Sequence, residues 1–559
     1  MQRLQGNWLY SPSDLIKFVE NEAVTWLDRY DKEFPGELIA DETAAEDRLI
    51  QTTGEEHESE VLARFTTDGR DIADLKNSVA AFESTVRAMS EGREIIYQAR
   101  LEDGDLAGYA DFLIRVEGAS EFGSWHYEVW DTKLARSVKP YFAIQLCCYA
   151  ELLEAIQRRR PEHVGVVLGN GSQERLKTDD YLFYYRAVKR AFLMQQRMFD
   201  PMQQPKLDGM ADYGRWNGHV RRALDARDDL SAVANIRASQ VEKLQATGIF
   251  TVTGLATSDL KGIRGLEPAA FARLRSQARL QIGSRGESTP RYELVPPDTE
   301  RPRLGFGSLP PASPNDVCFD IEGYPLIDGG IEYLLGAVSR EDGQLLFRDW
   351  WAHDRTEERA AFEAFVKWVH DRWRNDPAMH IYHYAAYETS ALKRMMGRYA
   401  CCEQEVDDLL RNRVFIDLYT VVRQGLIVGE PAYSLKNIEH LYMPVRHGDV
   451  TSAGDSMVYY HRWLQDRDGP DCGTSAALRL IRDYNEADCR STWRLMDWLR
   501  SVQASASVPF VPPGELKQPN PITNHLAALA DEMLAEIPSD ESSDAEKWRV
   551  HRFLAHLLA

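Results

Sequence analysis

The first 205 residues carry the hydrophobic pattern of a mixed α/β domain. Four stretches predict β-strands, through two-residue alternation or a short apolar run: residues 94–101, 109–116, 126–133 and 163–169. Residues 141–157 have the apolar period of a helix. Residues 13–30 predict a single opening helix with five apolar residues near one face: Leu15, Phe18, Val19, Trp26 and Leu27.

A second α/β block begins with DVCFDIEGYP, residues 316–325, which alternates as a β-strand. Asp320 and Glu322 therefore point to the same side of that strand, roughly 7 Å apart by strand rise. The elements predicted after it are two strands, a helix, a fourth strand and an amphipathic helix: residues 331–339, 344–353, 356–373, 378–388 and 481–499. The fourth strand is expected to end on Glu388.

Helical and proline-rich segments separate the two blocks. Residues 230–283 show three helices joined by Gly-Ile and Gly-Ile-Arg-Gly turns. This layout is typical of helix-hairpin-helix modules, whose turns present backbone N–H groups to phosphates, and it suits a packed helical spacer equally well. Residues 284–315 contain seven prolines without sustained periodicity, which indicates a linker, and residues 508–521 form a shorter one.

Composition places the chain among folded, multidomain proteins. A length of 559 residues predicts about three or four domains. The apolar fraction of 44%, with 24 Tyr and 13 Trp, is sufficient for sizeable cores. The opening residues lack the apolar core of a signal peptide, and no stretch reaches membrane-spanning length. Seven cysteines form no disulfide framework, so we expect a cytoplasmic protein without a membrane partner.

The net charge of −21 disfavours a protein that coats nucleic acid, but it is compatible with a nuclease. Clustered acids that hold cations lose part of their own charge when the metal binds. Basic stretches occur at 186–197 and 219–227, and each is more typical of a solvated helix face than of a nucleic-acid site.

The first group of candidate catalytic residues lies in the first block. Asp111 and Asp131 are on neighbouring predicted strands, where two carboxylates can hold a divalent cation. Lys133, two residues after Asp131, can orient the attacking water and stabilise developing charge. Gln145 and Tyr149 are four apart on one helix face. Asp131 and Lys133 alone would suit an exposed strand pair, and His57 is a further possible ligand.

In this order, the residues resemble the RecB-type branch of the PD-(D/E)XK nucleases, especially the members similar to CRISPR-adaptation exonucleases. The resemblance covers residues 9–205 and implies catalytic roles for six residues: His57, Asp111, Asp131, Lys133, Gln145 and Tyr149. Many relatives bind an iron–sulfur cluster through four cysteines. The equivalent positions here are Asn21, Ala211, Gly214 and Val220, and the chain has no cysteine before Cys147. An iron–sulfur cluster is therefore predicted to be absent.

The second group comprises four acids and a tyrosine. Asp320, Glu322, Glu388 and Asp488 can bracket two cations about 4 Å apart, and Tyr484, one turn before Asp488, can position the attacking water. An Asp-x-Glu pair alone would suit a solvated strand face. The ordered set resembles the ribonuclease H-like DEDD exonucleases of the tyrosine type, closest to the YprB-type subgroup.

Two acids depart from that family's pattern. Glu388 takes a position usually held by Asp, so its longer side chain must retract to reach the metals. Asp417, in FIDLYTVVR, is a secondary acid candidate for the same cleft, and a helix-capping or pairing role is equally open.

Both halves together resemble a family of RecB-like nucleases described in bacteria. The resemblance implies an α/β multidomain fold with five parts: a PD-(D/E)XK, restriction-endonuclease-like domain at 1–205, a helix-hairpin-helix-like module at 206–283, a Pro-rich linker at 284–315, a ribonuclease H-like DEDD exonuclease domain at 316–505, and a Pro-rich linker with a helical tail at 506–559. Longer members continue into a superfamily-one helicase. This sequence has no Gly-x4-Gly-Lys-(Ser/Thr) loop, so we expect either a separate helicase partner or a fragment of a longer helicase–nuclease.

The sequence thus predicts a Mg²⁺- or Mn²⁺-dependent nuclease that hydrolyses DNA, single-stranded or at ends, with a second site of the 3′–5′ exonuclease type. Two alternatives stay open. One is a nucleic-acid-binding scaffold that recruits a helicase, with one or both sites silent. The other is an exonuclease directed to RNA, since discrimination depends on contacts to the 2′-hydroxyl.

Overall fold

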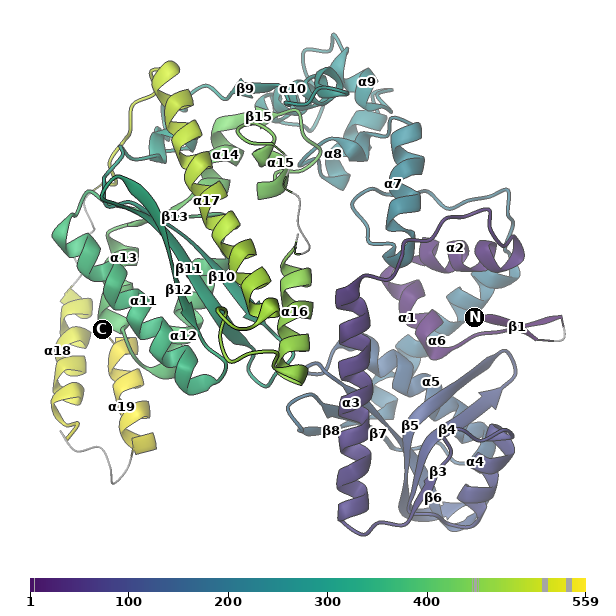
Figure 1. Ribbon diagram of the computed structural model, residues 1–559. Coiled ribbons are helices and arrows are strands. Elements are labelled where there is room, and N and C mark those ends of the chain that lie inside the picture. The colour runs from purple at the N-terminus through teal and green to yellow at the C-terminus, as the bar shows by residue number, and fades with distance from the viewer. Residues whose placement is uncertain are drawn as a thin grey trace. The chain divides into compact units, whose positions relative to one another are not determined.

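The computed structural model describes residues 1–4, 6–444, 446, 450, 452–514, 521–538 and 545–558. The chain divides into two compact units, Met1–Ser231 and Ala232–Ala559. The division falls inside the segment predicted as the helical module, and it places residues 232–283 with the second block. Figure 1 traces the elements of both units.

The first unit is a mixed α/β fold around a six-stranded sheet. Its strands are β1 (Gln2–Leu4), β2 (Asn7–Leu9), β3 (Ile72–Asp74), β4 (Ile95–Asp103), β5 (Leu106–Ser120), β6 (Gly123–Lys133), β7 (His163–Leu168) and β8 (Gln173–Lys177). Its α-helices are α1 (Pro12–Glu20), α2 (Glu22–Glu33), α3 (Ala45–Thr67), α4 (Ala81–Ser90), α5 (Pro140–Gln157), α6 (Thr178–Arg197) and α7 (Asn217–Ala226). The main sheet has the order β3-β4-β5-β6-β7-β8, and β1 and β2 form a separate hairpin.

Helices cover both faces of the six-stranded sheet. The pairs β4–β5 and β5–β6 are antiparallel, whereas β3–β4 and β6–β7 are parallel, and α5 joins β6 to β7. One core includes Leu15 of α1, Leu152 of α5 and Phe192 of α6. A smaller core on α3 joins Val61 to Phe112. Asp111, inside β5, and Asp131, near the end of β6, therefore lie on neighbouring strands of a sheet that is covered by helices.

The single helix predicted for residues 13–30 is wrong, because the helix is interrupted at Asn21. The Asn21 backbone is extended, and its side-chain oxygen accepts a hydrogen bond from the Ala23 N–H at 3.0 Å, which begins α2. Asparagine is a favoured N-cap residue because this bond satisfies an otherwise unpaired N–H. Leu15 and Leu27 are still buried, whereas Val19 is exposed.

The second unit contains a five-stranded sheet, a small two-stranded sheet and many helices. Its strands are β9 (Tyr292–Leu294), β10 (Val317–Tyr324), β11 (Ile331–Glu341), β12 (Gln344–Trp351), β13 (Ile381–His383), β14 (Phe415–Asp417) and β15 (Leu426–Val428). Its α-helices are α8 (Ala238–Gln245), α9 (Val252–Ala256), α10 (Pro268–Ser284), α11 (Arg355–Asn375), α12 (Tyr387–Tyr399), α13 (Glu403–Arg411), α14 (Leu418–Gly425), α15 (Leu435–Glu439), α16 (Ala453–Asp466), α17 (Ala476–Ser505), α18 (Pro521–Ala535) and α19 (Ala545–Leu558).

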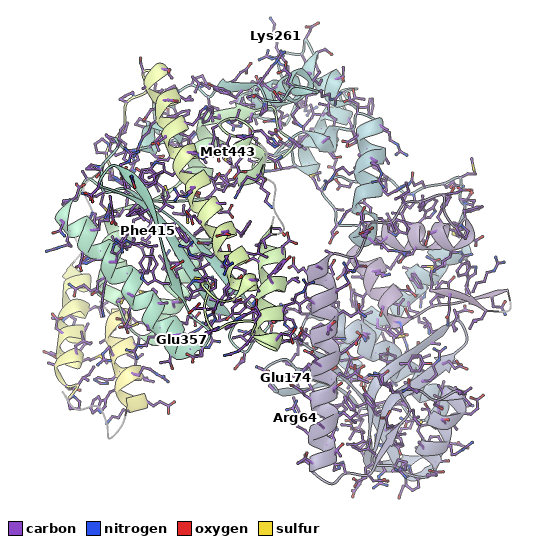
Figure 2. The ribbon with its side chains drawn as sticks, viewed as in Figure 1. Arg64, Glu174, Lys261, Glu357, Phe415 and Met443 are labelled. Carbon is purple, nitrogen blue, oxygen red and sulfur yellow. The ribbon has the colours of Figure 1, made fainter. Side chains whose placement is uncertain are left out.

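The five-stranded sheet has the order β12-β11-β10-β13-β14. β10, β11 and β12 are antiparallel, whereas β10, β13 and β14 are parallel. Strand alternation in β10 sends Cys318 to the face covered by α17, where Cys489 and Trp493 also pack. It sends Phe319 to the opposite face, against Phe365 of α11. Phe415 of β14 packs on that same opposite face (Figure 2).

The fourth strand predicted for residues 378–388 is wrong in its extent. β13 covers only Ile381–His383, and Glu388 lies in the first turn of α12. Ala385 has a φ of 74°, in the left-handed region, so the chain turns sharply and cannot continue as a strand. The apolar pattern of the stretch does not reveal this turn.

The segments predicted as linkers are packed against the second unit. β9, inside 284–315, pairs with β15, and Phe306 and Leu309 are buried in the α17-side core. The N–H of Val511 donates to the carbonyl of Gly307 at 2.9 Å. Residues 515–520 of the second predicted linker, and residues 539–544 of the tail, lie outside the described residues.

Candidate metal centre

Three carboxylates converge on the face of the five-stranded sheet that α17 covers. Asp320 and Glu322 come from β10, and Asp488 comes from the middle of α17. One carboxylate oxygen from each lies within 4.8 Å of the other two. Strand alternation accounts for the first pair, and the packing of α17 across β10 adds the third.

A buried amide, Asn485, lies between these carboxylates. Its Nδ2 donates to Asp320 Oδ2 at 2.8 Å and to Glu322 Oε1 at 3.5 Å. A β-carbon at Gly336, on the adjacent strand β11, would lie 1.7 Å from Asn485 Oδ1, so glycine is required there. Asn485 was not among the residues predicted for this site. Its available signal was a polar residue on the apolar stripe of α17, between Ile481 and Cys489.

Two further predicted residues, Glu388 and Tyr484, lie beside the three acids. Glu388 is buried, its charge acts on Asp320, and its Oε2 has no hydrogen-bond partner among the described residues. His383, at the end of β13, places Nδ1 3.5 Å from that same oxygen. Tyr484 is one turn before Asp488 on α17, and burial with the charge of Asp488 nearby raises the pKa of its hydroxyl.

A cation, Arg446, is also present, and no local motif marked it. Its Nη1 lies 2.6 Å from Asp488 Oδ1, and its guanidinium pairs with the buried carboxylate of Glu439. Glu439 also accepts a hydrogen bond from Ser491 Oγ at 2.5 Å. Glu439 and Ser491 therefore fix a positive charge next to the acids.

The electrostatics of this group favour a bound cation. Burial, reinforced by Glu322, Asp488 and Glu388, holds the pKa of Asp320 well above its ordinary value. Burial and the nearby Asp488 raise the pKa of Glu322 to about 8. Several carboxylates crowded in a low dielectric must share protons or take up a metal. The all-oxygen donor set and the unpaired Glu388 oxygen fit Mg²⁺ or Mn²⁺.

The secondary acid candidate, Asp417, makes the hydrogen bonds of a helix cap. Its Oδ1 accepts from the N–H groups of Tyr419 and Ala385, both at 2.9 Å, and its Oδ2 accepts from the Thr420 hydroxyl at 2.6 Å. These bonds begin α14 and tie it to the turn that follows β13.

In the first unit, four of the predicted residues lie close together on β5, β6 and α5. Asp131 pairs with Lys133 and faces Gln145 Nε2 at 3.4 Å. Asp111 accepts two hydrogen bonds from Thr132, from the N–H and from the hydroxyl, both at 2.8 Å. Burial, with Asp131 and Glu58 nearby, holds the pKa of Asp111 well above its ordinary value.

The other two predicted residues of the first unit differ in their surroundings. Tyr149 donates to the Tyr109 carbonyl at 2.6 Å, and burial with Asp131 and Asp111 nearby raises its pKa. His57 is buried on α3, and its Nε2 has no hydrogen-bond partner among the described residues. Its neighbour Glu58, which the sequence analysis missed, acts on Asp111 and accepts a hydrogen bond from Gln98.

The four positions equivalent to the family's cluster cysteines have ordinary protein contacts. Asn21 Nδ2 donates to the carbonyl of Asp212 at 2.9 Å, and Val220 packs in a cluster with Trp26 and Trp216. The absence of an iron–sulfur cluster stays a prediction.

A comparison with known protein families supports the ribonuclease H-like interpretation of part of the second unit. Residues 317–500 match the model of a family described as the RNase_H superfamily. No curated protein matches the chain. Within the part of the chain that the structure describes, no helix is both long and apolar enough to cross a membrane. The mixed α/β chain therefore contains an RNase H-like domain at 317–500, which includes Asp320, Glu322, Glu388, Tyr484 and Asp488, and the ribonuclease H-like part of the predicted fold is confirmed to that extent.

Proposed function

We propose that the protein is a divalent-metal-dependent nuclease that hydrolyses phosphodiester bonds at Asp320, Glu322 and Asp488. The observation that carries the proposal is the convergence of these three carboxylates within 4.8 Å inside an RNase H-like domain. Hard oxygen donors at this spacing suit Mg²⁺ or Mn²⁺.

The surrounding residues support hydrolysis. A bound divalent ion would supply a water of lowered pKa and charge for the leaving oxygen. The Tyr484 hydroxyl, next to Asp488, would orient the attacking water. Asn485 fixes the directions of Asp320 and Glu322, and Arg446 offers positive charge to a phosphate oxygen.

The finer assignment is a DEDD-type exonuclease that trims DNA, single-stranded or at ends, from 3′ termini. Glu388 would be its fourth acid, supplied by the start of α12. The nearby Tyr484 supports the tyrosine type of this mechanism. RNA is the alternative substrate, and matched oligonucleotides distinguish the two polymers.

We expect purified protein to cleave 5′- or 3′-labelled oligonucleotides with Mn²⁺ and to be inactive in EDTA. Because the pKa of Glu322 is raised to about 8, protons compete with the metal below that pH. The Mn²⁺ concentration for half-maximal cleavage should therefore fall as the pH rises from 6 to 8. Intact DNA and RNA under all these conditions, with tight DNA binding, would favour the scaffold instead.

We propose a second hydrolytic site of the PD-(D/E)XK type in the first unit. The supporting observation is the group of Asp111, Asp131, Lys133 and Gln145 on two adjoining strands and one helix. Lys133 is largely buried, and its interaction with Asp131 keeps its ammonium group beside the carboxylates. That positive charge would stabilise the negative charge that develops on the phosphate. Residues 206–283 are proposed separately as a helix-hairpin-helix-like module, on the glycine-containing turns between their helices.

In the background of the inactivating substitution Asp488→Asn, Lys133→Ala is expected to lower the remaining cleavage by roughly a hundredfold, as for loss of one charge-stabilising group. Lys139→Ala, which removes an exposed lysine just before α5, is the control. Equal rates for the two variants, or no cleavage left to measure in Asp488→Asn, would contradict an active second site.

A further inference from the structure

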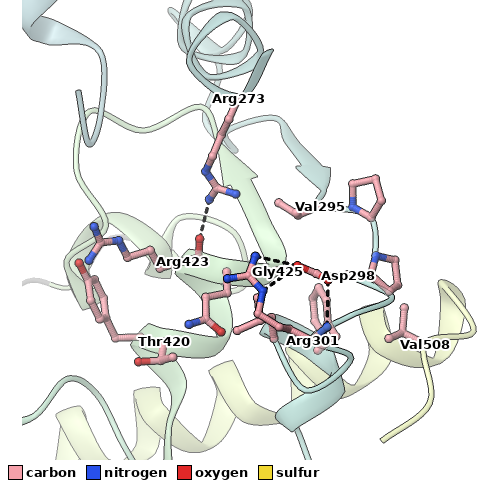
Figure 3. Close-up of a pocket in the computed structure, with 14 residues that line it drawn as sticks. Arg273, Val295, Asp298, Arg301, Thr420, Arg423, Gly425 and Val508 are labelled. Atoms are coloured by element: carbon pink, nitrogen blue, oxygen red, sulfur yellow. Dashed lines mark hydrogen bonds and ion pairs between the residues drawn. The ribbon is translucent and has the colours of Figure 1, made fainter. Parts of the chain in front are cut away.

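A cleft in the second unit lies beside α14, away from the acids described above. It has a volume of about 430 Å³ and is bordered by α10, the 295–306 segment and α14. Val295, Pro296 and Phe306 contribute apolar surface to it, and three guanidinium groups line it as well. Those groups belong to Arg273, Arg301 and Arg423 (Figure 3).

Two of these arginines have no acidic partner. No carboxylate of a described residue forms an ion pair with Arg273 or Arg423, and the acid in the cleft, Asp298, is already bound by Arg301 at 2.8 Å. Arg273 Nη2 donates to the backbone carbonyls of Arg423 and Leu426 at 2.5 and 3.0 Å. The Arg423 side chain is exposed, and its guanidinium carbon lies 5.9 Å from the centroid of the Tyr419 ring. In a chain with 87 acidic and 66 basic residues, such a group of unneutralised charges requires explanation.

A second hollow of about 260 Å³ shares Arg273 and Arg423 and adds Arg237. No acidic side chain lines it among the described residues. Arg237, Arg273 and Arg423, here called the basic track, therefore line two hollows that share two of these arginines, and the larger hollow also has an apolar wall. Guanidinium groups suit phosphate oxygens through their planar fork, and an apolar wall suits a base or sugar.

We propose that this track binds the backbone of a single nucleic-acid strand, with one nucleotide seated in the larger cleft. The volume of the larger cleft is at the lower end of the roughly 300–1,000 Å³ typical of small-molecule sites. The cleft is therefore larger than an isolated phosphate needs. Two hollows that share a pair of arginines match successive phosphates of one strand better than a free nucleotide.

Helix α14 extends from the turn that precedes Glu388 to the track. Asp417 caps the beginning of this helix and bonds the Ala385 N–H in the turn that leads to Glu388, while Arg423 and Gln424 line the cleft near its end. The inference rests on the proposed nuclease function. The track would hold the substrate strand at a position away from the phosphodiester bond that is hydrolysed.

The test is binding of a fluorescein-labelled 15-nucleotide oligo(dT) by anisotropy in EDTA, so that no cleavage occurs. Arg423→Gln should weaken binding about tenfold, the loss expected for one charge-assisted contact. The slope of log K against log salt should fall by about 0.7, the value for one phosphate on a single strand. Arg423→Gln keeps the backbone carbonyl that Arg273 uses, so folding should be unaffected, and a thermal melt checks this.

Arg279→Gln is the matched control, because it removes an exposed arginine from the same helix as Arg273, outside both hollows. Equal binding by Arg423→Gln and Arg279→Gln would overturn the proposal. If Arg423→Gln weakened the binding of free dTMP but left the binding of oligo(dT) unchanged, strand binding would be overturned and the cleft would be assigned to a mononucleotide. Arg423-dependent binding by a protein that cleaves nothing in Mn²⁺ would uphold the track while refuting the proposed hydrolysis.

Discussion

Replacing Asp488 by asparagine is expected to lower metal-dependent cleavage by more than about a thousandfold. Loss of even a residue that only supports a metal ligand costs about 10–100-fold, and loss of one charge-stabilising donor costs about 10²–10³. Asp488 is one of three carboxylates that meet within 4.8 Å, so the asparagine removes both a ligand and a negative charge. The rate should be measured with Mn²⁺ in the Lys133→Ala background, which removes any contribution from the first unit.

The control for this substitution is Asp483→Asn, which makes the same charge change on an exposed face of the same helix. It should leave the rate within about twofold. Calorimetric titration with Mn²⁺ should show weaker binding only for Asp488→Asn. Equal rates in the two variants, or cleavage lost with metal binding unchanged, would exclude Asp488 as a ligand.

Local periodicity was sufficient to predict on which side of their strand or helix the central acids lie. Asp320 and Glu322 share a side because a strand alternates, and Tyr484 and Asp488 share a side because a helix repeats every 3.6 residues. Such short-range rules also predicted α5 in nearly its observed extent, and they predicted parts of β5 and β6, which are longer than expected.

Features that depend on single backbone angles or on distant segments were not accessible in this way. The left-handed Ala385 moves Glu388 from a strand to a helix, and the Asn21 cap divides one predicted helix into two. Arg446 reaches Asp488 only because the chain folds α15 and the segment after it against α17. The pattern of apolar residues in the sequence would be almost the same whether or not the Ala385 turn, the Asn21 cap and the Arg446 contact were present.

A buried acid far from the reacting groups, Glu358, is expected to govern the stability of the sheet that carries them. It is 0% exposed on α11 and accepts hydrogen bonds from the Glu332 N–H at 2.7 Å and from Arg355 and Arg398, both at 2.9 Å. Tyr399 donates to it as well. It therefore links the beginning of β11 to the end of α12, the helix that starts with Glu388.

Glu358→Gln should lower the free energy of local opening of β11, α11 and α12 by about 3 kcal/mol. Breaking a buried ion pair costs about 3–5 kcal/mol, and the lower figure applies because Arg355 and Arg398 keep part of their contact with water. Hydrogen exchange read by mass spectrometry over these elements measures the opening directly, without assuming that both units unfold together. Glu363→Gln is the matched control on the same helix, since its partners Arg359 and Lys367 are solvent-exposed and such pairs contribute less than about 1 kcal/mol. Equal exchange in the two variants would show that Glu358 does not link β11 to α12, and Glu388 would then depend on other contacts for its position.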